Sequence, residues 1–431
     1  MRMAFRCDTC GHKSAKWMGF CPQCGSMDPL VEDSGTVRST ARAAAVVGLR
    51  AAAERTQERR PTSWGEIDRV LGGGIVAGSV LLLGGEPGVG KSTLLLQMAG
   101  AVAGGGRAVV VASAEESADQ VAMRASRLGI ADDSISLVSD DDVDAIVALA
   151  ERERPALLVV DSIQTVGVPE IGAAPGGVAQ VRESAARLVR LAKTTGVAVV
   201  LVGHVTKEGG LAGPKMLEHM VDVVLYLEGD PDRGFRVLRS IKNRFGATHV
   251  SGMFDMRSEG LREVDDPSKL FLDGWESDVP GTVIYPAVEG RRSILVEIQA
   301  LVSPTNQAQP RRSIRGLDPT RVNQVLAVLD RHSDLTLHDK EVYVNVVGGW
   351  RLDEPGCDLA VALAIASSYA DHPLGRLAAW GEIGLVGEVR SIPMETRRIE
   401  ELDRMGLENR IAPLGGQPMR LGDALERAGL R

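Results

Sequence analysis

Apolar and polar positions alternate along the chain in two ways, and each predicts a different kind of element. Between residues 62 and 264, short continuous apolar runs are separated by stretches of helical period, and the clearest runs cover residues 79–84, 108–112, 157–160 and 197–202. Strands that alternate with helices predict a parallel sheet covered by helices on both faces. Two later runs, 221–228 and 235–242, are separated by a Gly-Asp-Pro turn signal and predict an added hairpin.

A second apolar core begins near residue 281. Apolar runs predict strands over residues 282–286, 293–301 and 341–347, and helical periods cover 318–332 and 358–369. Ahead of both folded regions lie a cysteine-rich segment and an Ala/Arg/Glu-rich stretch, closed by Pro61, that is typical of a linker. We therefore predict four parts, with boundaries at 1–30, 31–60, 61–270 and 271–431.

Composition removes several function classes. The chain has 431 residues, of which 44% are hydrophobic and 25% charged, a balance that excludes general disorder. The formal net charge of −8 excludes a basic nucleic-acid coat, so any contact with DNA has to come from local patches. No apolar run is long enough for a membrane helix, and the first residues do not resemble a secretory signal. We therefore expect a cytoplasmic protein with no membrane contact.

The strongest chemical signal is a phosphate-binding loop between a predicted strand and a predicted helix. Residues 85–92 read Gly-Glu-Pro-Gly-Val-Gly-Lys-Ser and fit the pattern GxxxxGK[ST] without a mismatch. The glycines let backbone N–H groups surround an anion, and the following helix adds its positive end. Lys91 is expected to hold the β- and γ-phosphates of ATP, and Ser92 to ligate Mg²⁺. The residues expected to contact ATP or ADP are Gly85, Glu86, Pro87, Gly88, Val89, Gly90, Lys91, Ser92 and Thr93.

Further polar side chains stand where predicted strands end. Asp161 follows the run 157–160 and is the candidate for a second Mg²⁺ ligand, although capping of a turn would explain it too. Glu115 and Glu116 follow another run, and we favour Glu115 for activation of water, with Glu116 as its close competitor. His204 ends a further run, where it could reach the γ-phosphate, and a histidine without a chemical role fits that position equally well.

Four of the five cysteines lie within the first 24 residues. Cys7, Cys10, Cys21 and Cys24 form two Cys-x₂-Cys pairs separated by ten residues, a spacing that suits one closed, tetrahedral and structural Zn²⁺ site. The alternative is a pair of reversible disulfides, which cytosolic reductants would oppose. A catalytic zinc is disfavoured because four protein ligands leave no open position.

Two glycine-rich loops, 167–180 and 207–219, are longer than most connections between strands and helices. Their length points to function, and Lys207 and Lys215 in the second loop are candidates for contacts with DNA phosphates. A local basic cluster has the same candidate role, although such clusters are more often solvated surface; it consists of Arg311, Arg312 and Arg315.

Taken in order and at this spacing, the motifs resemble the bacterial RadA (Sms) family of recombination and repair proteins. The resemblance covers essentially the whole chain. Its carrying features are the four-cysteine motif with Trp17-Met18-Gly19-Phe20 between its halves, the Arg-Val-Leu-Gly-Gly-Gly of residues 69–74, the phosphate-binding loop and the pentapeptide Lys242-Asn243-Arg244-Phe245-Gly246.

The resemblance implies an α/β fold: a RecA-like P-loop ATPase core with a parallel sheet, an N-terminal four-cysteine zinc finger and a C-terminal Lon protease-like α+β domain. It implies a homo-hexameric ring related to helicases of the DnaB type, which uses ATP on single-stranded and branched DNA to drive branch migration. It also implies the RecA recombinase as a partner, and ATP/ADP, Mg²⁺ and Zn²⁺ as cofactors. Lys242 and Arg244 would match a Lys-x-Arg that reaches the nucleotide of a neighbouring subunit, although a solvated strand edge or a contact with DNA phosphates would explain them as well.

The C-terminal part departs from the protease pattern that it resembles. In Lon-type proteases a serine is the nucleophile and a downstream lysine its base, whereas Gly356 and Thr396 stand at those positions here. We therefore expect a proteolytically silent scaffold. One alternative is a Lon-like peptidase that uses Cys357, but no lysine follows Lys340 and the thiol lacks an evident activator. Another is a KaiC-like signalling ATPase, which would require neither the four cysteines nor the pentapeptide.

Overall fold

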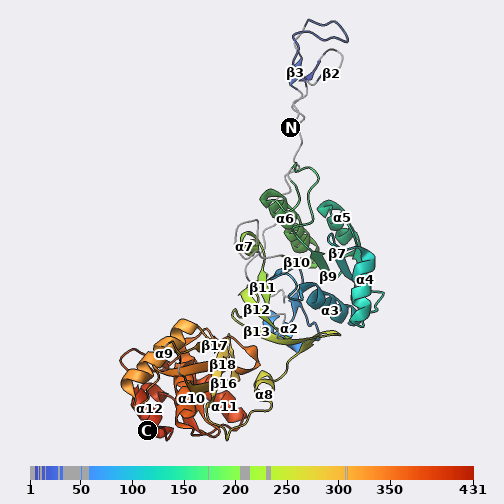
Figure 1. Cartoon of the computed structure of the whole chain (residues 1–431). Coiled ribbons are helices and arrows are strands. Elements are labelled where there is room, and N and C mark those ends of the chain that lie inside the picture. Colours follow the sequence, from blue (N-terminus) through green and yellow to red (C-terminus); the bar gives the residue numbers. More distant parts are fainter. Residues whose placement is uncertain are drawn as a thin grey trace. The chain divides into compact units, whose positions relative to one another are not determined.

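The structure of the chain is a computed structural model, shown in Figure 1. It describes residues 5–7, 9, 12–14, 16–27, 30–32, 50, 58–172, 174–203, 214–229, 234–305, 307 and 309–431. The chain divides into two compact units, Met1–Thr56 and Gln57–Arg431, and each is described separately below.

The first unit is built around a small antiparallel sheet. Its strands, in the spatial order β2-β1-β3, are β1 (Phe5–Arg6), β2 (Lys13–Ser14) and β3 (Val31–Glu32). Its small core contains Cys7, Cys21 and Leu30, against which Phe5 and Met18 pack. A core of this size stabilises a fold only weakly, which is why such units commonly depend on a bound metal.

The second unit begins with a nine-stranded sheet in the order β14-β13-β12-β11-β6-β10-β9-β7-β8. The strands from β11 to β8 run parallel, and β12, β13 and β14 extend one edge in antiparallel fashion. The parallel sheet and the added hairpin are therefore confirmed, whereas β8, β13 and β14 were not predicted. The strands are β6 (Val80–Gly85), β7 (Val109–Ser113), β8 (Ile135–Val138), β9 (Leu157–Asp161), β10 (Ala198–Val202), β11 (Val223–Glu228), β12 (Phe235–Asn243), β13 (Ser251–Arg257) and β14 (Gly260–Glu263).

Helices cover both faces of this sheet, as Figure 1 shows, because alternate side chains of the central strands enter two separate cores. In β6, Leu81 and Leu83 belong to one core, and Val80 and Leu82 to the other. A strand buried on both faces has a continuous apolar sequence, and for this reason the central strands could be predicted from apolar runs. The first core also contains α2 (Gly65–Leu71) and α3 (Lys91–Gly104), and the second contains α5 (Val143–Glu153) and α6 (Val178–Thr195).

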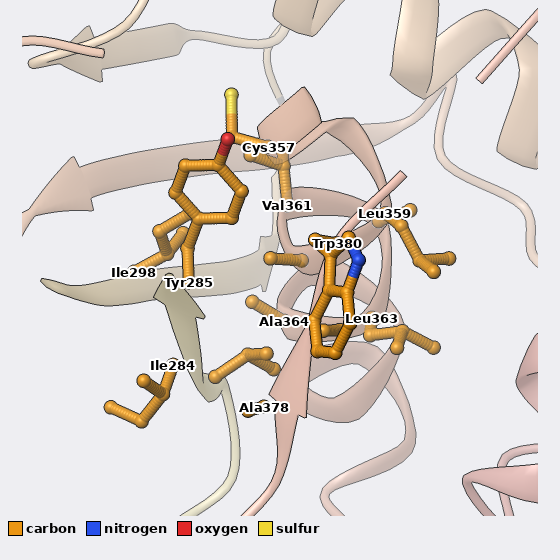
Figure 2. Close-up of a cluster of buried hydrophobic side chains, with 14 of the residues drawn as sticks. Ile284, Tyr285, Ile298, Cys357, Leu359, Val361, Leu363, Ala364, Ala378 and Trp380 are labelled. Atoms are coloured by element: carbon orange, nitrogen blue, oxygen red, sulfur yellow. The ribbon is translucent and has the colours of Figure 1, made fainter. Parts of the chain in front are cut away.

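The second unit also contains a separate six-stranded sheet, in the order β17-β18-β16-β15-β19-β22. Its long hairpin, β15 (Thr282–Glu289) and β16 (Arg292–Pro304), packs against α10 (Asp358–Ala370). Figure 2 shows side chains of α10 around Trp380, and every residue of the helix from 358 to 367 is buried. The other strands are β17 (Arg312–Arg315), β18 (Lys340–Val346), β19 (Ala378–Ala379) and β22 (Arg410–Ile411), and the flanking helices include α9 (Pro319–His332), α11 (Glu395–Arg404) and α12 (Leu421–Arg427).

None of the helices that the structure describes combines the length and the apolar character needed to cross a bilayer.

Candidate nucleotide-binding site

The phosphate-binding loop lies where β6 ends and α3 begins. Gly90 is the N-cap of α3 with a φ of 111°, a conformation that side chains other than glycine rarely adopt. At Gly88, φ is 77° and an added Cβ would meet nothing within 4 Å. The crest of the loop is therefore open, with the N-terminus of a 14-residue helix behind it. Such an arrangement offers backbone N–H groups and a positive helix end to an anion.

Lys91 lies inside this loop rather than in solvent. Its side chain is only 4% exposed, and Nζ donates hydrogen bonds to the carbonyl oxygens of Gly85 at 2.9 Å and Glu86 at 3.0 Å. Burial lowers the pKa of Lys91, while the charges of Asp161 and Glu115 act in the opposite direction. The ammonium group is thus held at the loop and is close to two carboxylates.

Ser92 and Asp161 are brought together from separate elements. The Ser92 hydroxyl, in the first turn of α3, donates a 2.8 Å hydrogen bond to Oδ2 of Asp161, at the end of β9. A hydroxyl and a carboxylate oxygen at this distance are the protein ligand set that Mg²⁺ takes beside phosphates. The residues present therefore fit this ion.

The two adjacent glutamates have different surroundings. Glu115 accepts a 2.6 Å hydrogen bond from the Ser162 hydroxyl and contributes to the electrostatics of Lys91, so its carboxylate faces the loop. Glu116 instead forms a two-pronged ion pair with Arg124 on α4 (Ala118–Arg127), with N–O distances of 2.6 and 2.5 Å. The two carboxylates are therefore held by different partners, Glu115 by Ser162 and Glu116 by Arg124.

Some predicted residues lie outside the described part of the chain. His204 and Lys207 are among them, and the same holds for the side chain of Lys215, at the start of α7 (Pro214–Glu218). The first glycine-rich loop is shorter than predicted, because α6 begins at Val178. Gln180, in the first turn of α6, is buried and bonds to the main chain of Val168, which ties the start of the loop to the helix.

Lys242 and Arg244 lie near the end of the sheet at which β6 begins, whereas the phosphate-binding loop leaves from the end at which β6 stops. The Arg244 guanidinium is 3.4 Å from Oδ1 of Asp222, and Oδ2 of Asp222 accepts a hydrogen bond from the N–H of Val80, the first residue of β6. Lys242 Nζ donates to the carbonyl oxygens of Glu218 and Val221. Only β11 lies between β12 and β6, so the separation from Lys91 runs along the strands and not across the sheet order.

The cysteine cluster fits a tetrahedral metal. The sulfurs of Cys7, Cys21 and Cys24 all lie within 4.8 Å of one another, and Cys10 falls outside the described residues. The sulfurs of Cys7 and Cys24 are 3.8 Å apart, and Zn–S bonds of about 2.3 Å in a tetrahedron give about 3.8 Å. A disulfide needs about 2.05 Å, and the described cysteines form none.

The start of α10 does not accommodate the serine nucleophile of the protease pattern. A Cβ added at Gly356 would lie 2.4 Å from Cδ1 of Ile392 and 2.9 Å from the Tyr285 hydroxyl, so a serine there has no room. Cys357 is 3% exposed, and burial raises the pKa of its thiol far above the ordinary value. Thr396 is exposed on α11. Of the basic cluster, Arg311 and Arg315 line an open groove of about 550 Å³, and Arg312 does not.

Several residues around the site escaped the sequence reasoning. Ser162 holds Glu115, Arg124 holds Glu116, and Asp222 holds both Arg244 and the start of β6. Arg236, in β12, donates to the Val89 carbonyl in the phosphate-binding loop. In the sequence, Arg236 stands out only as a charged residue within the apolar run 235–238. The contacts of Ser162, Arg124 and Asp222 have no such signal, because they depend on the fold.

Comparison with known proteins gives consistent matches. A family model described as an AAA domain matches residues 50–210, and one described as a rubredoxin metal binding domain matches residues 5–32. The DNA repair protein RadA of Halalkalibacterium halodurans is 46% identical over 425 residues, which cover 96% of this chain and 93% of that protein. The same-named proteins of Pseudomonas aeruginosa and Escherichia coli are 47% and 43% identical, over 96% and 100% of this chain and 93% and 96% of theirs.

Proposed function

Because the chain belongs to the bacterial RadA family of DNA repair proteins, we propose that it is a homo-hexameric translocase that promotes branch migration of recombination intermediates. The chain is an ATP-hydrolysing DNA repair enzyme with a RecA-like ATPase core and an N-terminal zinc ribbon. The finer activity, translocation on single-stranded and branched DNA with RecA as partner, is the proposal. A KaiC-like signalling role loses its basis, since RadA relatives match almost the entire chain.

The observation that carries the proposal is that the charged residues lie at the two opposite ends of strand β6. The loop follows Gly85 at one end of β6, and Arg244 lies near Val80 at the other end. The strand between them spans roughly 16 Å at about 3.3 Å per residue, so Arg244 is too distant to serve the nucleotide of its own subunit. Arg244 is nevertheless 56% exposed, and neighbouring Ile241 is 44% exposed, as suits a face that contacts another subunit.

Within one site, each residue has a distinct proposed role. Lys91 would move from the loop carbonyls to the β- and γ-phosphates, and Ser92 and Asp161 would hold Mg²⁺, which would supply positive charge beside the phosphates. Glu115 accepts the proton of the attacking water, with its carboxylate oriented by Ser162. His204 is proposed to sense the γ-phosphate. Arg244 and Lys242 from the neighbouring subunit would stabilise the charge on the transferring group.

Mixed rings test the proposed assembly. Lys91→Ala and Arg244→Ala subunits, each inactive alone, should regain part of the ATPase activity when co-assembled, because some junctions join an intact loop to an intact arginine. The matched control combines Lys91→Ala with Glu115→Gln subunits. Both changes damage the nucleotide-binding residues and leave Arg244 intact, so no junction can be complete and no activity should return. Absence of recovery in rings that contain both Lys91→Ala and Arg244→Ala subunits means either that Arg244 acts within its own subunit or that hydrolysis requires every junction to be intact.

Arg244 has one other role to exclude. If Arg244→Ala keeps normal ATPase activity and loses affinity for single-stranded DNA, the residue binds DNA phosphates instead. DNA contact is proposed for the groove at Arg311 and Arg315, because a net charge of −8 leaves only local basic patches for this purpose. Charge reversal at these two positions should weaken DNA binding in a salt-dependent manner and leave basal ATPase activity unchanged.

We further propose the division into a zinc finger (1–30), linker (31–60), ATPase domain (61–270) and proteolytically silent Lon-like domain (271–431). Metal analysis should find about one zinc per chain, lost in Cys21→Ser, because three described thiols already converge. Reduced, metal-free protein with an intact fold of residues 5–32 would contradict the zinc assignment.

A further inference from the structure

Arg236 is a nearly fully buried cation directly behind the phosphate-binding loop. It lies in β12 and is 3% exposed, whereas arginine is rarely buried to this degree. Its Nε donates a 2.8 Å hydrogen bond to the carbonyl oxygen of Val89, which is also buried. Its Nη1 donates to the carbonyl oxygen of Phe235 at 2.8 Å, which orients the guanidinium.

The geometry of the peptide bond gives this contact a consequence for phosphate binding. The Val89 carbonyl and the Gly90 N–H belong to one planar trans peptide, so the two groups point in opposite directions. When Arg236 holds the oxygen toward the interior of the protein, the Gly90 N–H is turned toward the opposite side, where the loop surrounds its anion. Gly90 has a φ of 111°, and as a glycine it has more backbone freedom than other residues, so an external hold on this peptide matters.

Lys91 and Arg236 hold the loop in different ways. Lys91 binds the carbonyl oxygens of Gly85 and Glu86, and it has to leave them when it binds phosphates. Arg236 reaches the loop from β12, and its bond to the carbonyl oxygen of Val89 need not break when phosphates bind. Both sets of bonds are buried and charge-assisted, and therefore stronger than bonds between neutral groups, but only the bond of Arg236 does not compete with the phosphates.

We propose that Arg236 is a positioning residue of the ATPase site, which keeps the Gly90 N–H directed at the nucleotide phosphates through the Val89 carbonyl. This inference rests on the proposed nucleotide site and adds a residue to it. It requires no contact between Arg236 and the nucleotide, and it does not depend on the oligomeric state or on DNA.

Equilibrium binding of a fluorescent ADP, methylanthraniloyl-ADP, measures the proposed effect without relying on turnover. Arg236→Met keeps much of the side-chain volume and removes the donors, and it should weaken binding about tenfold or more. Arg236→Lys retains the charge with one donor group and should restore part of the affinity. The matched control is Arg239→Met on the same strand, because Arg239 pairs with Glu228 and Glu289. The affinity of this variant for the fluorescent ADP should stay within about twofold of wild type.

The outcomes separate positioning from a merely structural role. Thermal unfolding of each variant sets a temperature at which it is folded, and binding is measured there. Wild-type affinity in folded Arg236→Met overturns the proposal, even if its melting temperature falls. If Arg236→Met does not fold, Arg236→Lys decides: unchanged affinity overturns the proposal and weakened affinity supports it. If wild-type protein itself fails to bind the probe, the proposed nucleotide site fails and not this inference alone.

Discussion

Two helices of the second unit, α3 and α10, begin in similar ways and differ in what surrounds their first turns. Each follows a short segment that contains glycine and starts with residues of chemical interest. Before α3, a Cβ on Gly88 would meet no atom within 4 Å; before α10, a Cβ on Gly356 would run into Ile392 and Tyr285. The loop before α3 is therefore exposed at Gly88, whereas the position of the protease serine is filled by side chains, with a cavity of about 210 Å³ beside it at Cys357 and Asp358.

The polar groups at the two helix starts follow the same division. At α3, Lys91, Ser92 and Asp161 converge beside the open loop, bound to partners that a phosphate or Mg²⁺ can replace. At α10, Asp358 is fully buried and bound by Arg321 and by the Ile383 N–H, and burial raises the pKa of this carboxyl. The two helix starts thus differ in what their polar groups are bound to, and not in whether a glycine precedes the helix.

The largest expected effect is at α3. Lys91→Ala should reduce ATPase turnover at least about 10³-fold, because it removes the charge that stabilises the transferring phosphoryl group. Phosphate release measured at saturating ATP checks this. A variant with more than a tenth of the wild-type rate would show that the open helix start is not the ATPase site.

The next effect distinguishes the two glutamates. Glu115→Gln should lower kcat about 10²- to 10⁴-fold, as expected for loss of a general base, with little change in ADP affinity. Glu116→Gln is the matched control and should stay within a few-fold of wild type, because its partner is Arg124. The reverse ranking of the two variants would reassign the base.

A change at α10 should affect stability and not activity. Gly356→Ser overpacks the contact with Ile392 and Tyr285, and we expect it to lower the free energy of unfolding by about 1–3 kcal/mol without creating peptidase activity. Gly104→Ser is the control, since a Cβ there meets nothing within 4 Å. Denaturant unfolding and a casein degradation assay measure both properties. Proteolysis in Gly356→Ser would mean that the helix start can still work as a site.

The smallest expected effect concerns Cys357. Because burial raises its pKa, the thiol stays protonated between pH 7 and pH 9, a range in which an ordinary thiol with a pKa of about 8.5 becomes largely ionised. Alkylation of Cys357 by iodoacetamide, followed by mass spectrometry, should be slow and nearly independent of pH in this range. Urea-unfolded protein provides the reference rate. Cys357→Ala should keep full ATPase activity. A native alkylation rate equal to the rate of the unfolded protein would show that the thiol is not protected by burial.

The sequence predicted features made by residues close together in the chain, and it missed contacts between residues far apart in the chain. The loop of residues 85–92 is local, and Asp161 was predictable because parallel strands end at one sheet edge. The choice between Glu115 and Glu116 depends on Arg124, which reaches back from α4. The Arg236–Val89 bond joins residues 147 positions apart, and the closure at Gly356 depends on side chains from two other segments. Such contacts leave no mark in local periodicity.

The central place of β6 also determines how slowly its backbone amides exchange with solvent. All six of its residues are buried, and it is paired with β11 on one side and β10 on the other. Backbone amides in such a strand exchange with deuterated solvent only when the surrounding structure opens as a whole. Their protection should therefore last longest within the unit, and the loop that leaves from Gly85 is attached to the segment that is slowest to open.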